Sequence, residues 1–272
     1  MSVAGADSAA SRDGLHVAKR DRVVYVTLDR PAALNAIDDA MVDGLDRVLT
    51  EVEADQTIRA LVLEGRGDVF CVGMDLACLD RGFRDHSYFR RFLERLNTVL
   101  LRMEALPVPV VAAVNGLARA GGFEIILASD LAIAADEARI GDNHTQFGVM
   151  PGGGATQRAP RRLGEQRARE LILTARWLDG RGAAEYGLVL RSVPRAELTA
   201  AVEELVGQFR NKSRACLAAA KGAMNDGASL GLADGIRLEI DRFFAYLEQS
   251  PDATEGFTAY REKRSPRWST DA

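Results

Sequence analysis

The residues with the clearest chemical potential follow an apolar run, Val110–Val114, which predicts a buried strand ended by the turn signal Asn115-Gly116. Gly121 and Gly122 then open an apolar helical stretch. The N–H groups at the start of a helix lack partners within the helix and lie at the positive end of its dipole. Because glycine has no Cβ atom, a carbonyl oxygen can approach such groups closely. The stretch therefore predicts a site that stabilises a developing oxyanion.

Glu124 falls in the first turn of this predicted helix. A glutamate there can simply complement the helix dipole. It also lies within a short reach of whatever the free N–H groups hold, which makes it a candidate acid or base.

The composition of the 272-residue chain is that of an ordinary globular protein, with 47% apolar residues, 27% charged residues and a net charge of −4. This mild acidity argues against a nucleic-acid platform, and no segment has the apolar length of a membrane span. The three cysteines have no metal-like spacing, so we expect a reducing compartment, no disulfides and no metal. Residues 1–13 are small and polar, and we expect them to be disordered rather than a signal peptide. A cytoplasmic location is expected.

Strand and helix patterns alternate through the first two thirds of the chain, which predicts an α/β fold. The first two strands form a hairpin around Arg20-Asp21-Arg22. The predicted strands are His16–Lys19, Val23–Leu28, Arg59–Glu64, Val69–Val72, Val110–Val114 and Leu131–Ala135, and the predicted helices between them are Ile37–Ala54, Phe89–Leu106 and Gly121–Ala128.

Helical patterns dominate after Pro151-Gly152-Gly153-Gly154. They cover Glu165–Ala175, Ala196–Phe209, Ser213–Asp226 and Leu232–Gln249, with a last helix from near Ala253. We therefore divide the chain into a disordered terminus (1–13), an α/β core (14–195) and a helical region (196–272) that forms a cap or an assembly surface.

Several short motifs, in this order, resemble the crotonase (enoyl-CoA hydratase/isomerase) superfamily over residues 14–268. They are Asp29-Arg30-Pro31, Leu34-Asn35-Ala36, Phe70-Cys71-Val72-Gly73-Met74-Asp75-Leu76, Ala112-Ala113-Val114-Asn115-Gly116, Gly121-Gly122-Phe123-Glu124, Ala128-Ser129-Asp130, Phe147-Gly148, Pro151-Gly152-Gly153, Thr156-Gln157-Arg158 and Ala259-Tyr260-Arg261-Glu262-Lys263-Arg264. The resemblance implies a spiral of ββα units, with the helical C-terminal region used for oligomerisation. It also implies acyl-CoA thioesters as substrates, with no cofactor beyond the CoA moiety that they carry.

Members of this superfamily polarise the thioester carbonyl between two backbone N–H groups, which map onto Met74 and Gly121 in this chain. The donors stabilise the enolate oxygen that forms during addition, elimination or isomerisation. Hydratases of the superfamily add two glutamates, and one of them maps onto Glu124. The other position holds His144 here, and histidine can also transfer protons near neutral pH. Asp142 and Asn143 adjoin His144 and could orient its ring or bind substrate. The alternative is a purely structural His144.

The resemblance also assigns substrate-binding residues. The expected CoA-binding residues are Arg30, Ala32, Leu34 and Ala36, together with Tyr260 and Lys263 from a neighbouring subunit of a homotrimer or a dimer of trimers. The expected acyl-pocket residues are Arg119, Pro151 and Gly152. Arg119 is either a solvated charge or a guanidinium that recognises a polar or carboxylate end of the acyl group. We expect a loop at 77–87 to shape the same end of the pocket, and Asp75 to cap a short helix from Leu76.

These features favour an acyl-CoA lyase of the enoyl-CoA hydratase type, which adds or eliminates water at an α,β-double bond. The same oxyanion site would also serve an isomerase, a decarboxylase or a C–C hydrolase. A third class is a CoA-binding member that has lost turnover, although Glu124 and the Gly121-Gly122 donors argue against it.

Overall fold

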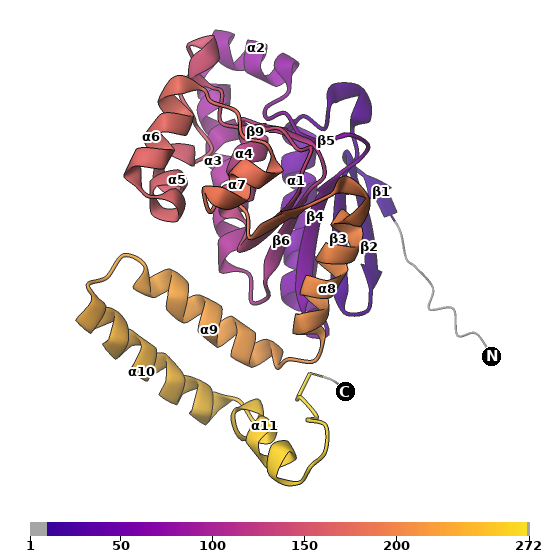
Figure 1. Cartoon of the computed structure of the whole chain (residues 1–272), viewed down its shortest axis with the longest axis vertical. Coiled ribbons are helices and arrows are strands. Elements are labelled where there is room, and N and C mark those ends of the chain that lie inside the picture. Colours follow the sequence, from indigo (N-terminus) through magenta and orange to yellow (C-terminus); the bar gives the residue numbers. More distant parts are fainter. Residues whose placement is uncertain (1–9, 271–272) are drawn as a thin grey trace, which may run out of the picture.

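The structure, a computed structural model, describes residues 10–270 and is built on two β-sheets (Figure 1). The larger sheet has the strand order β1-β2-β3-β4-β6-β8-β10. Its strands are Ala10–Arg12 (β1), Leu15–Arg20 (β2), Val23–Leu28 (β3), Ala60–Gly65 (β4), Val110–Val114 (β6), Leu131–Ala135 (β8) and Arg191–Val193 (β10). From β3 to β10 the strands are parallel, and β3 and β6 are buried along their whole length. Continuous apolar runs such as Val110–Val114 are typical of parallel strands that are covered on both faces.

The N-terminal edge of this sheet differs from the expectation. The β2–β3 hairpin forms as predicted, and β1 pairs antiparallel with β2, with Ser11 opposite His16. The expectation of disorder is therefore wrong for Ala10–Arg12, because backbone pairing with β2 orders a segment that has no strand pattern of its own. The same expectation also covered residues 1–9, which lie outside the described residues.

The smaller sheet joins β5 (Val69–Cys71), β7 (Leu117–Arg119) and β9 (Ile140–Gly141) in parallel. Each of these short strands directly follows a strand of the larger sheet. A helix comes next in each case: α2 (Leu76–Arg84) after β5, α4 (Gly121–Ala128) after β7, and α5 (Ala155–Leu163) after β9 and a short 3-10 turn. The chain therefore repeats a strand–strand–helix unit, which confirms the predicted α/β fold of ββα units. The second strand of each unit leads into the loops that form the site described below.

Aspartate side chains cap the starts of helices α1 and α3. Asp38 accepts a hydrogen bond from the Met41 N–H (2.8 Å) at the start of α1, and Asp85 accepts one from the Tyr88 N–H (3.0 Å) at the start of α3. The helices of the core are Asp39–Ala54 (α1), Leu76–Arg84 (α2), His86–Ala105 (α3), Gly121–Ala128 (α4), Ala155–Leu163 (α5), Glu165–Thr174 (α6) and Gly180–Glu185 (α7), with 3-10 turns at Pro31–Ala33 (η1), Thr145–Phe147 (η2) and Arg195–Glu197 (η3).

The segment 77–87 is helical over most of its length, which corrects the expectation of a loop. Asp75 caps α2 by accepting a hydrogen bond from the Ala77 N–H (2.9 Å), as predicted. Phe83 of α2 packs edge to face against Phe89 of α3, with 5.8 Å between the ring centroids. The cap and this aromatic contact both stabilise α2.

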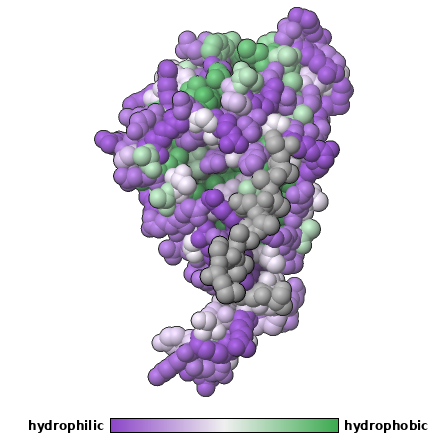
Figure 2. Space-filling model, turned by 90° about the vertical axis from the view of Figure 1, so that its right-hand side faces the viewer, coloured by the Kyte–Doolittle hydropathy of each residue, from purple (hydrophilic) through white to green (hydrophobic). Residues whose placement is uncertain are grey.

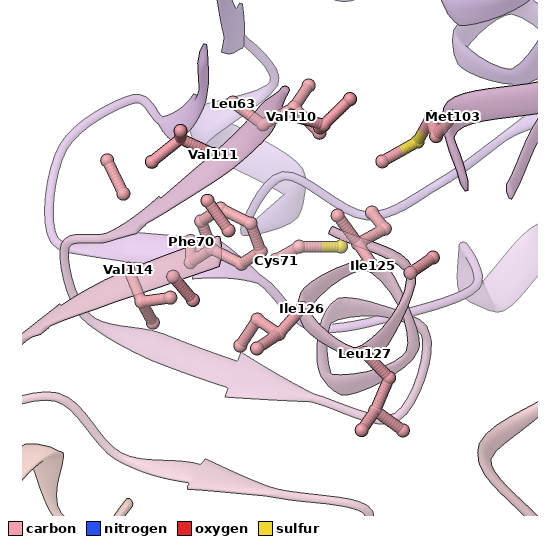
Figure 3. Packing of buried hydrophobic residues seen from close by; sticks show 14 of the residues in the cluster. Leu63, Phe70, Cys71, Met103, Val110, Val111, Val114, Ile125, Ile126 and Leu127 are labelled. Carbon is pink, nitrogen blue, oxygen red and sulfur yellow. The ribbon is translucent and has the colours of Figure 1, made fainter. Parts of the chain in front are cut away.

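Both sheets and α4 share one apolar core, part of which is shown in Figure 3. Phe70 and Cys71 of β5 lie there between the larger sheet and Ile125 of α4. Burial raises the pKa of the Cys71 thiol to about 12, so the thiol stays protonated near neutral pH. Cys71 therefore packs as a small apolar residue, as its place in a strand predicted.

The C-terminal helices divide into two groups. Helix α8 (Leu198–Arg210) packs on the larger sheet, and its Leu198, Val202 and Val206 belong to the core. Helices α9 (Arg214–Gly227), α10 (Leu232–Gln249) and α11 (Asp252–Arg261) extend away from this body (Figures 1 and 2). Within residues 10–270, no helix combines the length and apolar character needed to cross a bilayer.

A buried lysine holds α9 against the body. The Lys221 ammonium forms an ion pair with Asp130 (2.6 Å) and donates hydrogen bonds to the carbonyls of Met103 and Val108. The base of the projecting helices is thus fixed by a charged group that has partners in three segments of the core.

Candidate active site

A cavity of about 510 Å³ lies between α2, α3, the start of α4 and the segment 143–153. Its wall is mainly apolar, and its charged side chains are Arg119, Glu124 and His144. The lining residues are Val72, Met74, Leu76, Leu79, Phe83, Phe89, Phe92, Leu93, Leu96, Arg119, Ala120, Gly121, Glu124, Asn143, His144, Phe147, Val149, Met150, Gly152 and Gly153. An apolar cavity with a few converging polar groups is typical of a small-molecule site.

The two predicted oxyanion donors, the N–H groups of Met74 and Gly121, belong to residues that line this cavity. The flanking backbone is fixed by Ile37, whose N–H donates to the Gly73 carbonyl (2.8 Å) and whose carbonyl accepts from the Asp75 N–H (2.9 Å). Within residues 10–270, neither donor N–H has a hydrogen-bond acceptor. Two unpaired backbone donors on one cavity wall can stabilise a developing oxyanion.

Gly73 brings these two donors together. Its φ of +92° favours glycine, and a Cβ atom at this position would lie 2.8 Å from the Gly121 nitrogen. The close backbone contact between the β5–α2 connection and the start of α4 therefore depends on this residue.

The Glu124 carboxyl is buried, with 2% of the residue exposed. Its Oε1 accepts hydrogen bonds from the N–H groups of Gly153 (2.7 Å) and Ala155 (3.2 Å). Burial raises the pKa of Glu124 to about 7, against the lowering influence of His144 and of the Ala155 N–H. Glu124 thus contacts the start of α5 rather than merely complementing the dipole of α4, and it can gain or lose a proton near neutral pH.

Asp142 orients the ring of His144. Both carboxylate oxygens of the fully buried Asp142 lie 3.1 Å from His144 Nδ1. Burial by itself lowers the pKa of His144, but the hydrogen bond and charge of Asp142, helped by the charge of Glu124, outweigh it and raise that pKa above its usual value. With Nδ1 engaged, Nε2 is the ring nitrogen that remains for proton transfer.

Asn143, between these two residues, has a structural contact. It adopts a left-handed backbone conformation (φ 54°), and its side-chain amide donates to the Ala175 carbonyl (2.6 Å). This bond ties the segment before His144 to the end of α6.

Only two of the three residues predicted for the acyl pocket line the cavity. Arg119 and Gly152 line the cavity, whereas Pro151 is buried and does not line it. Most of the apolar wall was not predicted, because it comes from α2 and from one face of α3. Phe89, Phe92, Leu93 and Leu96 follow the i, i+3, i+4, i+7 spacing of a helix face, and this spacing is the signal that could have identified them.

The residues expected to bind CoA are not brought together within one chain. The Arg30 guanidinium forms ion pairs with Asp75 (2.9 Å) and Asp38 (3.1 Å), beside the turn that carries Ala32 and Leu34, and it donates to the buried Ala36 carbonyl. Tyr260, which is 80% exposed, and Lys263 lie at α11, at the opposite end of the molecule from α2 (Figure 1). A role for them at the cavity therefore requires a second copy of the chain.

A buried carboxyl and an imidazole that line one cavity with two free N–H donors can serve proton transfer next to a polarised carbonyl. A family model described as enoyl-CoA hydratase/isomerase matches residues 18–271. The chain belongs to this family and is an enzyme of the crotonase type.

Individual relatives agree with this assignment over nearly the whole chain. An enoyl-CoA isomerase/hydratase from Mycosarcoma maydis is 36% identical over 253 residues, which cover 90% of this chain and 91% of the relative. A mitochondrial methylglutaconyl-CoA hydratase from Mus musculus is 32% identical over 259 residues, which cover 93% of this chain and 82% of the relative. The crystal structure of an enoyl-CoA hydratase from Bacillus anthracis matches with a TM-score of 0.89 at 33% identity, covering 94% of this chain and 99% of that one.

Proposed function

We propose that the protein is an acyl-CoA lyase of the enoyl-CoA hydratase type, which adds water to an α,β-unsaturated acyl-CoA thioester or eliminates it. The observation that carries this proposal is that Glu124 and His144 line the same cavity as the free N–H groups of Met74 and Gly121. Names of relatives at 32–36% identity support hydratase or isomerase chemistry.

The thioester carbonyl oxygen accepts hydrogen bonds from the Met74 and Gly121 N–H groups, which draws electron density away from the β-carbon. The Glu124 carboxylate takes a proton from a water molecule as the water oxygen bonds to that carbon. The resulting enolate is stabilised at the two N–H groups, and loss of one such donor typically costs about 10²–10³ in rate. The His144 imidazolium then protonates the α-carbon, and before the next turnover Glu124 releases the proton that it took from water while His144 takes one up. Elimination runs through the same steps in reverse.

The test is incubation with trans-2-enoyl-CoA thioesters of four to ten carbons, with mass analysis of the products. We expect loss of the ultraviolet absorbance of the conjugated thioester and a product heavier by one water. A product of unchanged mass with a shifted double bond would instead establish an isomerase. Binding without any product would establish a member that has lost turnover.

We also infer that α10 mediates self-association, as expected for a homotrimer or a dimer of trimers. No residue of α10 is buried within one chain. Its exposed large apolar side chains are Leu232, Ile236, Ile240, Phe243, Phe244 and Leu247. An apolar face of this size on a helix that projects from the body is typical of a protein–protein contact.

Replacing Ile240 and Phe243 of α10 with aspartate is expected to reduce the mass of the assembly to that of a single chain, because two charges in an apolar interface have no partners. Sedimentation measures the mass, and Arg237→Ala, an exposed change on the same helix, is the matched control. An unchanged mass of the double variant would contradict the inference. If Tyr260 and Lys263 act across the interface, CoA affinity will fall together with assembly.

A further inference from the structure

Arg119 is the charged residue of the cavity wall that the proposed reaction does not use. It is the last residue of β7 and lies two residues before Gly121. Its guanidinium stands over the Phe147 ring, 5.6 Å from the ring centroid, and its Nε makes only a long contact (3.5 Å) to the Val72 carbonyl. The side chain is thus held beside the catalytic groups by an aromatic ring rather than by an acid.

Within residues 10–270, the Arg119 guanidinium has no carboxylate partner. The two acids at the site already have other partners. Asp142 pairs with His144, and the Glu124 carboxyl accepts two backbone N–H groups. By contrast, the Arg158 guanidinium is paired with an acid: it holds the Glu104 carboxylate at 2.8 and 2.9 Å. A cation that is partly withdrawn from water and bordered by apolar side chains favours an anionic partner.

We propose that Arg119 binds a carboxylate carried by the acyl group, so that the substrate is the CoA monothioester of a short unsaturated dicarboxylic acid. This inference rests on the proposed function, because it places the thioester carbonyl at Gly121. Because Arg119 and Gly121 line the same cavity two residues apart, we expect the carboxylate to lie only a few bonds from the reacting double bond. A guanidinium presents parallel donors that match both oxygens of a carboxylate.

The experiment compares substrates that differ only in charge at the end of the chain. Monothioesters of trans-2-unsaturated diacids with five, six and eight carbons are each paired with their terminal amides, which have nearly the same shape and no charge. For at least one pair, we expect kcat/KM of the wild-type protein to be about 10- to 100-fold higher for the acid, the range given by hydrogen bonds to a charged group. In Arg119→Leu this preference should disappear, and in Arg119→Lys part of it should return.

Arg139→Leu is the matched control. Arg139 is exposed, stacks on Trp177 (4.2 Å from the ring centroid) and does not line the cavity. This variant removes one positive charge nearby and should keep the acid preference. If Arg119→Leu lowers kcat/KM equally for the diacid monothioester and for its terminal amide, the inference is overturned. Arg119 would then act only through the charge balance of the site. The absence of an acid preference in the wild-type protein for all three pairs would also overturn it.

Binding separates this inference from the proposed function. Saturated diacid monothioesters, such as glutaryl-CoA, and their amides cannot be hydrated, so calorimetry with them reports recognition alone. A preference for the acid that depends on Arg119 would support the inference even if no enoyl-CoA were hydrated. Hydration of enoyl-CoA without any acid preference would support the proposed function and exclude this substrate class.

Discussion

Glu124→Gln is expected to lower kcat by about 10²–10⁴ while the protein still binds CoA thioesters, as for loss of a general base. The amide keeps the shape of the side chain, and its oxygen can still accept the hydrogen bonds that Gly153 and Ala155 donate to Glu124 Oε1. It cannot take a proton from water. Steady-state kinetics on the best enoyl-CoA substrate measures kcat, and calorimetry with a saturated acyl-CoA measures binding.

Gly153→Ala tests the position of the same carboxyl without removing it. A Cβ atom at residue 153 would lie 2.2 Å from Glu124 Oε2, so the carboxyl must move, and a displacement of about 1 Å can cost about 10²-fold in rate. Gly207→Ala in α8, where the added methyl group meets no atom within 4 Å, is the matched control.

Full activity of Glu124→Gln would mean that another group transfers the proton.

The groups that we propose for catalysis could be found in the sequence because they lie in or beside short motifs. Gly121 and Glu124 belong to one strand–turn–helix segment, and the resemblance to the family places His144 at the position of a glutamate. What the motifs could not provide is the environment of each group. The pKa of Glu124 depends on its burial and on Gly153 and Ala155, 29 and 31 residues away along the chain. Such contacts exist only once the chain has folded.

The acyl end of the cavity was predicted less well, because local pattern and tertiary contacts disagree there. The segment 77–87 was expected to be a loop that shapes this end of the pocket, beyond a short helix that begins at Leu76. The Asp75 cap and the contact between Phe83 and Phe89 make it helical. Helix α5 was missed for a related reason, since Pro160 lies inside it and proline disfavours a helix interior.

The second large effect is expected at His144, in both the rate and its dependence on pH. The proposed reaction needs an unprotonated Glu124 and a protonated His144. Activity should therefore fall below the pKa of Glu124, which is about 7, and fall again above the pKa of His144, which is raised above its usual value. The wild-type kcat/KM should follow a narrow bell near neutral pH, whose two apparent pKa values belong to the coupled pair.

His144→Gln is expected to lower kcat/KM by about 10²–10⁴ and to abolish the alkaline limb of this bell, because the imidazolium is the group lost on that side. The acidic limb should move to higher pH, since the charge of His144 lowers the pKa of Glu124 in the wild-type protein. Steady-state kinetics at constant ionic strength across the neutral range measures both changes. His86→Gln, at an exposed histidine outside the cavity, should leave the profile unchanged.

Asp142→Asn separates a catalytic His144 from a structural one. The asparagine oxygen can still accept a hydrogen bond from His144 Nδ1. The substitution nevertheless removes the negative charge of Asp142, which raises the pKa of His144 in the wild-type protein. The alkaline limb should therefore shift to lower pH, with a smaller loss at the optimum than in His144→Gln. If His144 only supports the fold, the alkaline limb will not move in Asp142→Asn, and only the acidic limb can shift, because the charge of Asp142 also raises the pKa of Glu124. Chemistry by Glu124 alone would then be the better account of the reaction.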